Sequence, residues 1–133
     1  MQLAPATITR LVAKARQART HAYAPYSGFA VGAAVLTADG RIFSGCNVEN
    51  ASFGLTICAE RNAVAAAVCS GQRPVAVAVV TKEGGVPPCG ACRQVLAEFS
   101  PGMPVILAAA EGDGVELCTL GELLPALFRL PEP

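Results

Sequence analysis

The sequence has few charged residues and no tryptophan. Charged residues make up 15% of the chain, below the roughly 25% usual for soluble domains, whereas 53% of the residues are hydrophobic. Basic and acidic residues balance at ten each, without a long basic segment, which argues against a nucleic-acid partner. A surface so poor in charge predicts that part of it is buried against copies of the same chain. The alternative is a monomer with an unusually apolar core.

Long apolar runs and a secretory leader are also missing. The longest apolar stretches are short pieces such as residues 75–80, far below the roughly 18 residues of a membrane helix. The N-terminal residues open no leader of the secretory type. We therefore expect a single domain over residues 1–133, located in the cytoplasm and without a membrane partner. In that reducing compartment, metal binding accounts for the six cysteines better than disulfides do.

What the chain does contain is a set of thiols with one acid beside them. Cys58 is followed two positions later by Glu60, and a C-x-x-C formed by Cys89 and Cys92 follows two prolines. Three soft ligands and one carboxylate are typical of a catalytic zinc site, in which a fourth coordination position stays open for water. A structural site would need a fourth cysteine or histidine. The only histidine, His21, lies near an expected helix end, where a surface or capping role is more common.

The other three thiols are expected to be small buried hydrophobic side chains, because a fourth ligand would close the open position. They are Cys46, Cys69 and Cys118.

Helical and strand patterns alternate along the chain and predict an α/β fold. A Thr7-capped helix is expected to run to about Ala22, and an Asp-Gly turn should join the first two strands in a hairpin. The last two strands are joined by too few residues for a crossover, so they should be antiparallel. The expected strands are 30–37, 41–46, 75–81, 104–109 and 115–119, and the further helices are 58–70, 89–99 and 120–124. Cys58 and Cys89 each open a helix, so two positive helix ends should converge on the thiols.

The cysteine pattern resembles a known family. The run CNVENASFGLTICAERNA at residues 46–63 and PPCGAC at residues 87–92 are similar to the zinc deaminases of nucleobases, in their all-cysteine variant. The longer run resembles the homotetrameric members of the cytidine and deoxycytidylate deaminase family. This resemblance implies a three-layer α-β-α fold with a mixed five-stranded sheet and one zinc per subunit at two helix N-termini. It also implies hydrolysis of cytidine and 2′-deoxycytidine to uridine and 2′-deoxyuridine plus ammonia, in pyrimidine salvage.

The resemblance also assigns roles to individual residues. Glu60 would accept the proton of the water and pass protons to N3 and the departing amine. Asn47 and Glu49, two apart in an extended segment, would hold the sugar, although a solvated loop is an alternative. Phe29 would pack on the pyrimidine ring rather than plug the core. The full set of implied substrate-binding residues is Phe29, Asn47, Val48, Glu49, Ala59 and Phe128.

Phe128 and Arg61 each leave two interpretations open. In the family a C-terminal aromatic closes a neighbouring subunit's pocket, and local docking of Phe128 is the equal alternative. Three thiolates leave a divalent metal at net −1, which opposes ionisation of its water. Arg61, next to Glu60, is therefore expected to donate hydrogen bonds to a thiolate, the alternative being a surface salt bridge.

Three rival functions remain. A deaminase of a nucleoside antibiotic such as blasticidin would use the same chemistry, and the sugar-binding pair at residues 47 and 49 argues against it. A non-catalytic zinc module would use the metal only for folding, which the acid beside an open position disfavours. A polynucleotide-editing deaminase is disfavoured by the neutral charge.

Overall fold

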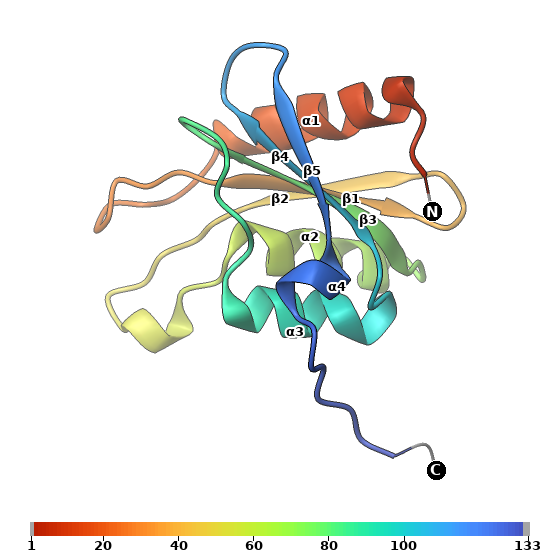
Figure 1. Cartoon of the computed structure of the whole chain (residues 1–133). Coiled ribbons are helices and arrows are strands. Elements are labelled where there is room, and N and C mark those ends of the chain that lie inside the picture. The colour runs from red at the N-terminus through yellow and green to blue at the C-terminus, as the bar shows by residue number, and fades with distance from the viewer. Residues whose placement is uncertain (1, 132–133) are drawn as a thin grey trace.

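The computed structural model describes residues 2–131 as a five-stranded sheet with helices on both faces (Figure 1). The strand order is β2-β1-β3-β4-β5. Only β3 and β4 are parallel, and the other neighbours are antiparallel, so the expected mixed sheet is confirmed. The strands are β1 Gly32–Thr37, β2 Ile42–Cys46, β3 Pro74–Thr81, β4 Pro104–Ala109 and β5 Val115–Thr119. The helices are α1 Pro5–Arg19, η1 Phe53–Leu55, α2 Ala59–Cys69, α3 Gly90–Phe99 and α4 Leu120–Leu123.

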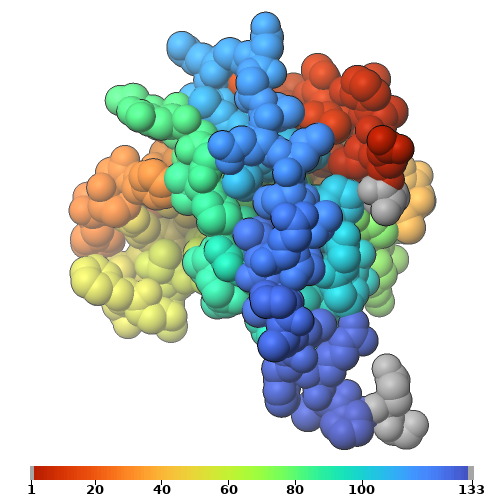
Figure 2. Space-filling model, viewed as in Figure 1, coloured from red at the N-terminus to blue at the C-terminus, as the bar shows by residue number. Residues whose placement is uncertain are grey.

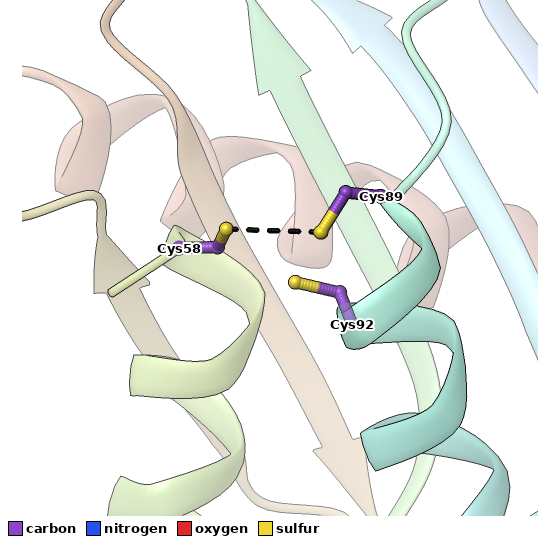
Figure 3. A group of neighbouring side chains, drawn as sticks. All are labelled: Cys58, Cys89 and Cys92. Atoms are coloured by element: carbon purple, nitrogen blue, oxygen red, sulfur yellow. Dashed lines mark hydrogen bonds between the residues drawn. The ribbon is translucent and has the colours of Figure 1, made fainter. Parts of the chain in front are cut away.

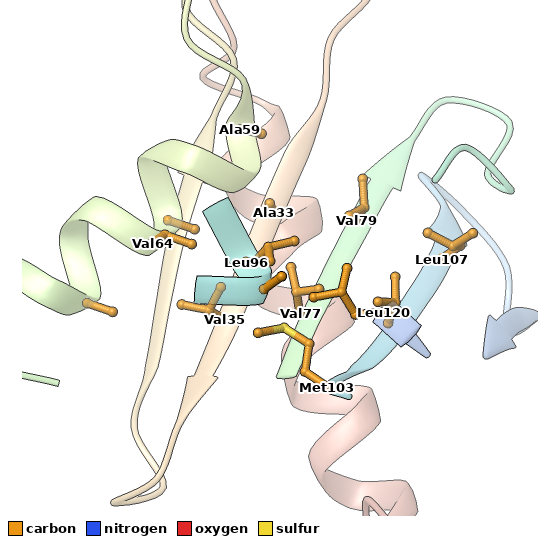
Figure 4. Close-up of a cluster of buried hydrophobic side chains, with 14 residues drawn as sticks. Ala33, Val35, Ala59, Val64, Val77, Val79, Leu96, Met103, Leu107 and Leu120 are labelled. Atoms are coloured by element: carbon orange, nitrogen blue, oxygen red, sulfur yellow. The ribbon is translucent and has the colours of Figure 1, made fainter. Parts of the chain in front are cut away.

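The two faces of the sheet are covered by different helices. α1 lies on one face, and α2 and α3 lie on the other, with α4 next to α3 (Figure 1). Because side chains alternate along a strand, Ala34 and Leu36 face α1, whereas Ala33 and Val35 join the core on the α2 side. All six residues of β1 are buried, as expected of a strand covered on both faces. The core on the α2 side, drawn in Figure 4, supports the helices that carry the site.

Glycine lets the β2 strand approach α2 closely. A Cβ atom added at Gly45 would lie 2.6 Å from the backbone nitrogen of Ala63 and 2.8 Å from the carbonyl of Ala59. Any larger side chain would push the start of α2 away from the sheet. Gly45 therefore helps to fix where this helix begins.

The first helix differs from the expectation. It begins at Pro5 with Ala4 as the N-cap residue, so the prediction that Thr7 caps it is wrong. Proline suits the first helical turn because its missing N–H would have no partner there and its φ is already helical. The helix ends at Arg19 rather than near residue 22, with Thr20 as the C-cap residue.

The predicted hairpin between β1 and β2 is confirmed, with Gly40 at φ 88° in its turn. The carboxylate of Asp39 accepts hydrogen bonds from the Thr37 hydroxyl and the Arg41 guanidinium, which hold the turn together. The predicted antiparallel pairing of β4 and β5 is also confirmed.

Beyond α4 the chain leaves the body as a tail. The tail extends from the end where α3 and α4 lie (Figure 2). Its backbone is tied to α3 by the Gln94 side chain, which donates to the Phe128 carbonyl at 3.2 Å. Among residues 2–131, none of the helices has the length and apolarity needed to span a bilayer.

Candidate metal centre

The three predicted ligands meet at one point between two helix starts. The Sγ atoms of Cys58, Cys89 and Cys92 all lie within 4.8 Å of one another, and those of Cys58 and Cys89 are 3.9 Å apart. Figure 3 shows the three side chains pointing toward a common centre from α2 and α3. Tetrahedral zinc with Zn–S bonds near 2.3 Å places two sulfur atoms about 3.8 Å apart, so the thiols fit this metal. They supply three ligands and leave the fourth position to water.

Both helices begin at a ligand. Cys58 is the N-cap residue of α2 and Cys89 that of α3, and neither side chain makes a capping hydrogen bond, so both sulfur atoms remain available to a metal. The partial positive charge at a helix N-terminus stabilises a thiolate by about 0.3–1 kcal/mol. Arg93 steadies the turn before α3, because its Nε donates to the Pro88 carbonyl at 2.7 Å and its Nη1 to that of Leu123 at 2.8 Å.

The thiols share their protons unequally. Hydrogen bonds from Cys92 and Arg61 lower the pKa of Cys58 to about 5. The contact with Cys58, together with burial, raises the pKa of Cys92. Of these two thiols, Cys58 therefore ionises more readily and Cys92 keeps its proton to higher pH. Metal binding must release that proton, which makes affinity for zinc fall at low pH.

Arg61 contacts the sulfur cluster directly. Its Nη2 donates to Cys58 Sγ at 3.3 Å, and the contact raises the pKa of the guanidinium. Within residues 2–131 the only ion pair joins Arg41 and Asp39, so the surface salt bridge considered for Arg61 is not formed there. The Nε of Arg61 is buried without a hydrogen-bond partner in the same part of the chain. A half-buried guanidinium next to sulfur is the arrangement expected if it offsets thiolate charge.

Glu60 lies beside the thiols and is buried. Only 5% of its surface is exposed, and desolvation raises the pKa of its carboxyl. It lines a cavity of about 200 Å³ together with Cys58 and Cys89. The other lining residues are Phe29, Val31, Asn47, Thr56, Ala59, Val79, Thr81, Val86 and Pro87. A raised pKa makes a carboxylate a stronger base, as the removal of a proton from water requires.

The sequence did not single out the floor of this cavity. Val79 and Thr81 lie two positions apart near the end of β3 and face the same side, and both are almost fully buried. The alternation of side chains along β3 could have indicated that residues 79 and 81 share a face of the sheet. However, a continuous apolar run on a strand buried on both faces does not tell which residues reach a cavity.

The predicted sugar residues are occupied by contacts within the chain. Asn47 is 8% exposed, and its side chain accepts from the Val31 N–H at 2.9 Å and donates to the Phe29 carbonyl at 2.8 Å. It is therefore not the solvated loop residue of the alternative interpretation. Glu49 is half-buried and lines a second cavity, which shares Thr56 with the cavity of Glu60. Hydrogen bonds from the Ser27 hydroxyl and nearby backbone lower the pKa of Glu49.

The other implied substrate residues separate into two groups. Phe29, 46% exposed, and Ala59, fully buried, line the cavity of Glu60. Val48 is 43% exposed and is not among the lining residues, because its backbone pairs with Tyr23 and Ile57. Phe128, 67% exposed in the tail, is not brought to this cavity within its own chain.

The prediction for the remaining thiols is wrong. Cys69 is exposed, and Cys46 and Cys118 are half-buried rather than buried. The buried stripe of α2 consists of Ala59, Glu60, Ala63, Val64 and Ala67. Cys69 lies two positions beyond the end of this stripe, where the helix faces solvent.

Fold and site together define a class of protein: an α/β chain with a three-thiol metal centre, an open coordination position and a buried acid beside it. Residues 5–108 match the model of the cytidine and deoxycytidylate deaminase zinc-binding region. The chain belongs to this family, and its three thiols are the group positioned to hold the zinc.

Similar proteins cover nearly the whole chain. A cytidine deaminase of Sporosarcina psychrophila is 52% identical over 124 residues, covering 91% of this chain and 90% of the relative. A cytidine deaminase of Mycobacterium tuberculosis H37Rv is 48% identical, covering 89% and 86%. The crystal structure of cytidine deaminase from Burkholderia pseudomallei superposes with a TM-score of 0.83 at 50% identity, covering 90% of this chain and 98% of that one.

Replacing a ligand thiol should abolish metal binding. We expect Cys92→Ser to lose zinc, because the site then offers two thiolates instead of three. Cys69→Ser is the matched control, since Cys69 is exposed and outside the cluster. Elemental analysis of the purified proteins checks this prediction. Full zinc occupancy in Cys92→Ser would exclude the assigned ligand set.

Proposed function

We propose that this chain hydrolyses cytidine and 2′-deoxycytidine to uridine and 2′-deoxyuridine, releasing ammonia, as an enzyme of pyrimidine salvage. The observation that carries the proposal is a buried carboxylate, Glu60, lining one cavity with thiols of a three-cysteine metal centre. A metal held only for folding needs neither an open coordination position nor a buried acid next to it. The names of relatives at 48–52% identity support the same reaction.

The chain's own residues would divide the work between proton transfer and orientation. Zinc, when bound, supplies a Lewis acid that makes water nucleophilic near neutral pH. Glu60 accepts the proton of that water as C4 of the base is attacked and donates it to N3; it then accepts the second proton, from the hydroxyl now on C4, and donates it to the departing amine. Burial raises the pKa of Glu60, which makes its carboxylate a stronger base toward the proton of the water.

The base would lie in the cavity of Glu60. Phe29, half exposed at this cavity, offers an aromatic face for the pyrimidine ring. Ala59 is the first residue of α2, so its backbone N–H has no partner within the helix and can donate to the base carbonyl. Its side chain is small enough to leave room for the ring.

The sugar would extend toward the second cavity. Asn47 lines the first cavity and Glu49 the second, and Thr56 lines both, so a nucleoside can span them. A carboxylate and an amide on neighbouring cavities suit the hydroxyl groups of a sugar. Val48, between them, would contribute its exposed side chain, because its backbone N–H already donates to the Ile57 carbonyl.

Arg61 would offset the charge of the thiolates. Its contact with Cys58 withdraws negative charge from a ligand sulfur, which favours ionisation of the water at the fourth position.

A homotetramer is the proposed assembly. Large apolar side chains are exposed on the single chain, among them Phe53 at 77%, Leu55 at 66% and Leu130 at 78%. Burying them between copies would remove apolar surface from water. Phe128, which lies away from the cavity of its own chain, is then available to a neighbouring subunit's cavity.

A cytoplasmic location is also proposed. All six cysteines are free thiols, and reduced thiols that serve as metal ligands suit a reducing compartment. Cell fractionation tests this assignment, and recovery of the protein outside the cytoplasm would contradict it.

Glu60→Gln should retain zinc and fold but lose roughly 10²- to 10⁴-fold in turnover number, the usual contribution of general acid–base catalysis. The amide keeps the shape of the side chain and cannot accept the proton. Loss of cytidine absorbance together with ammonia release measures the rate, and Glu111→Gln, on an exposed loop, is the control. A Glu60→Gln protein as active as its parent would exclude this role.

Arg61→Ala should weaken zinc binding roughly 10- to 100-fold and shift the pH dependence of kcat toward higher pH. The reason is that the thiolates lose the cation that balances them. Competition with a chelator measures the affinity, and Arg73→Ala, at an exposed position after α2, is the control. If neither affinity nor pH profile changed, the contact with Cys58 would have no part in tuning the metal.

Size-exclusion chromatography with light scattering should give the mass of four chains of 13.6 kDa. Phe53→Asp, which puts a charge into an exposed apolar position, should lower the mass, because a charge is costly to bury in an interface. A parent protein with the mass of one chain would contradict the assembly.

A further inference from the structure

The segment between α1 and β1 carries Phe29 to the cavity without regular structure of its own. Residues 24–31 form turns and irregular backbone, and Gly28 has a φ of 70°. The side chains of this segment are largely exposed, so burial alone does not fix its position. Its position therefore depends on hydrogen bonds from the rest of the chain.

One carboxylate accepts three of these hydrogen bonds. Glu49 accepts from the backbone N–H of Tyr26 at 2.9 Å and of Ser27 at 3.1 Å, both through Oε1. The Ser27 hydroxyl donates to the other oxygen, Oε2. A carboxylate has about four acceptor sites, so with three taken only about one remains for a ligand. Glu49 is therefore first of all a partner of the loop.

Ser27 passes this restraint on to Phe29. While its hydroxyl donates to Glu49, the same oxygen accepts from the Phe29 N–H at 2.9 Å. On the far side, the Phe29 carbonyl accepts from the Asn47 amide at 2.8 Å. The backbone of Phe29 is thus held at both its nitrogen and its oxygen, which sets the direction of the ring at the cavity mouth.

We propose that Ser27 is a positioning residue: its hydroxyl, held by the Glu49 carboxylate, fixes the backbone of Phe29 so that the ring stands ready over the base. The kinetic consequence rests on the function proposed above. A ring held in place before substrate arrives avoids the ordering cost of binding. The hydrogen bond from the Ser27 hydroxyl to the Glu49 carboxylate is charge-assisted, because this bond itself lowers the pKa of Glu49 and keeps it ionised at neutral pH.

The chain contains its own reporter for this loop. It has no tryptophan, and it has two tyrosines: Tyr23 lies just before the loop, and Tyr26 lies within it. Tyr23→Phe would leave Tyr26 as the only tyrosine emitter. That ring packs edge-on against Phe53 with the ring centroids 6.2 Å apart, so its motion is restricted while the loop is held.

The first experiment measures tyrosine fluorescence anisotropy of the zinc-loaded protein in the Tyr23→Phe background. We expect Ser27→Ala to lower the anisotropy of Tyr26, with Tm and zinc content unchanged, and Ser27→Thr to restore it by returning the hydroxyl. Ser52→Ala is the control, since Ser52 is an exposed serine whose side chain caps nothing. Equal anisotropy in Ser27→Ala and its parent would overturn the proposal.

The second experiment separates the base from the sugar. Ser27→Ala, which removes both hydrogen bonds of the hydroxyl, should lower kcat/KM roughly three- to tenfold, and by the same factor for cytidine and 2′,3′-dideoxycytidine. Glu49→Gln should cost more with cytidine, because only that substrate offers the 2′- and 3′-hydroxyls of the sugar. A Ser27→Ala loss confined to cytidine would mean that Ser27 serves the sugar, which overturns the proposal. A parent that deaminates neither nucleoside refutes the proposed function instead, and the anisotropy then decides the role of Ser27.

Discussion

The parallel pairing of β3 with β4 is the constraint on which the site depends. A parallel pair needs a crossover, and the crossover here contains α3, whose first turn carries two of the three thiols. α2 enters on the same face of the sheet, and Gly45 lets its first turn lie close to β2. The N-termini of α2 and α3 therefore lie close together near the end of the central strand β3, and their partial positive charges stabilise the thiolates there. If either helix began at a different place, its cysteine ligands would move away from those of the other helix.

Sequence spacing was sufficient to predict the chemical centre. Cys58, Glu60, Cys89 and Cys92 stand at a spacing typical of a catalytic zinc site, and the structure brings the three thiols within 4.8 Å. The strand and helix order followed from periodicity and turn signals, although Pro5 rather than Thr7 begins the first helix. Long-range hydrogen bonds were not predictable: nothing local in Asn47 or Glu49 indicates that both turn toward a loop some twenty residues earlier. The exposure of Cys69 likewise depends on where the buried stripe of α2 ends.

The buried polar groups of the site reduce the stability of the fold. Burial raises the pKa of Glu60, which means that its charged form is destabilised where it stands. The Nε of Arg61 is buried without a partner in the described part of the chain. Buried polar groups of this kind reduce stability, and they are retained where chemistry needs them. Around them the core is apolar and closely packed, which supplies the stability that the centre does not (Figure 4).

Arg93 gives the end of the chain a connection to the thiol turn. The planar guanidinium of Arg93 donates to the carbonyls of both Pro88 and Leu123. A shift of either carbonyl would therefore distort the hydrogen bond to the other. The segment leading into the tail is therefore connected directly to the turn preceding Cys89. A displacement of Leu123 would therefore reach the turn beside the thiols through a single side chain. α1, on the opposite face of the sheet, takes no part in this connection (Figure 1).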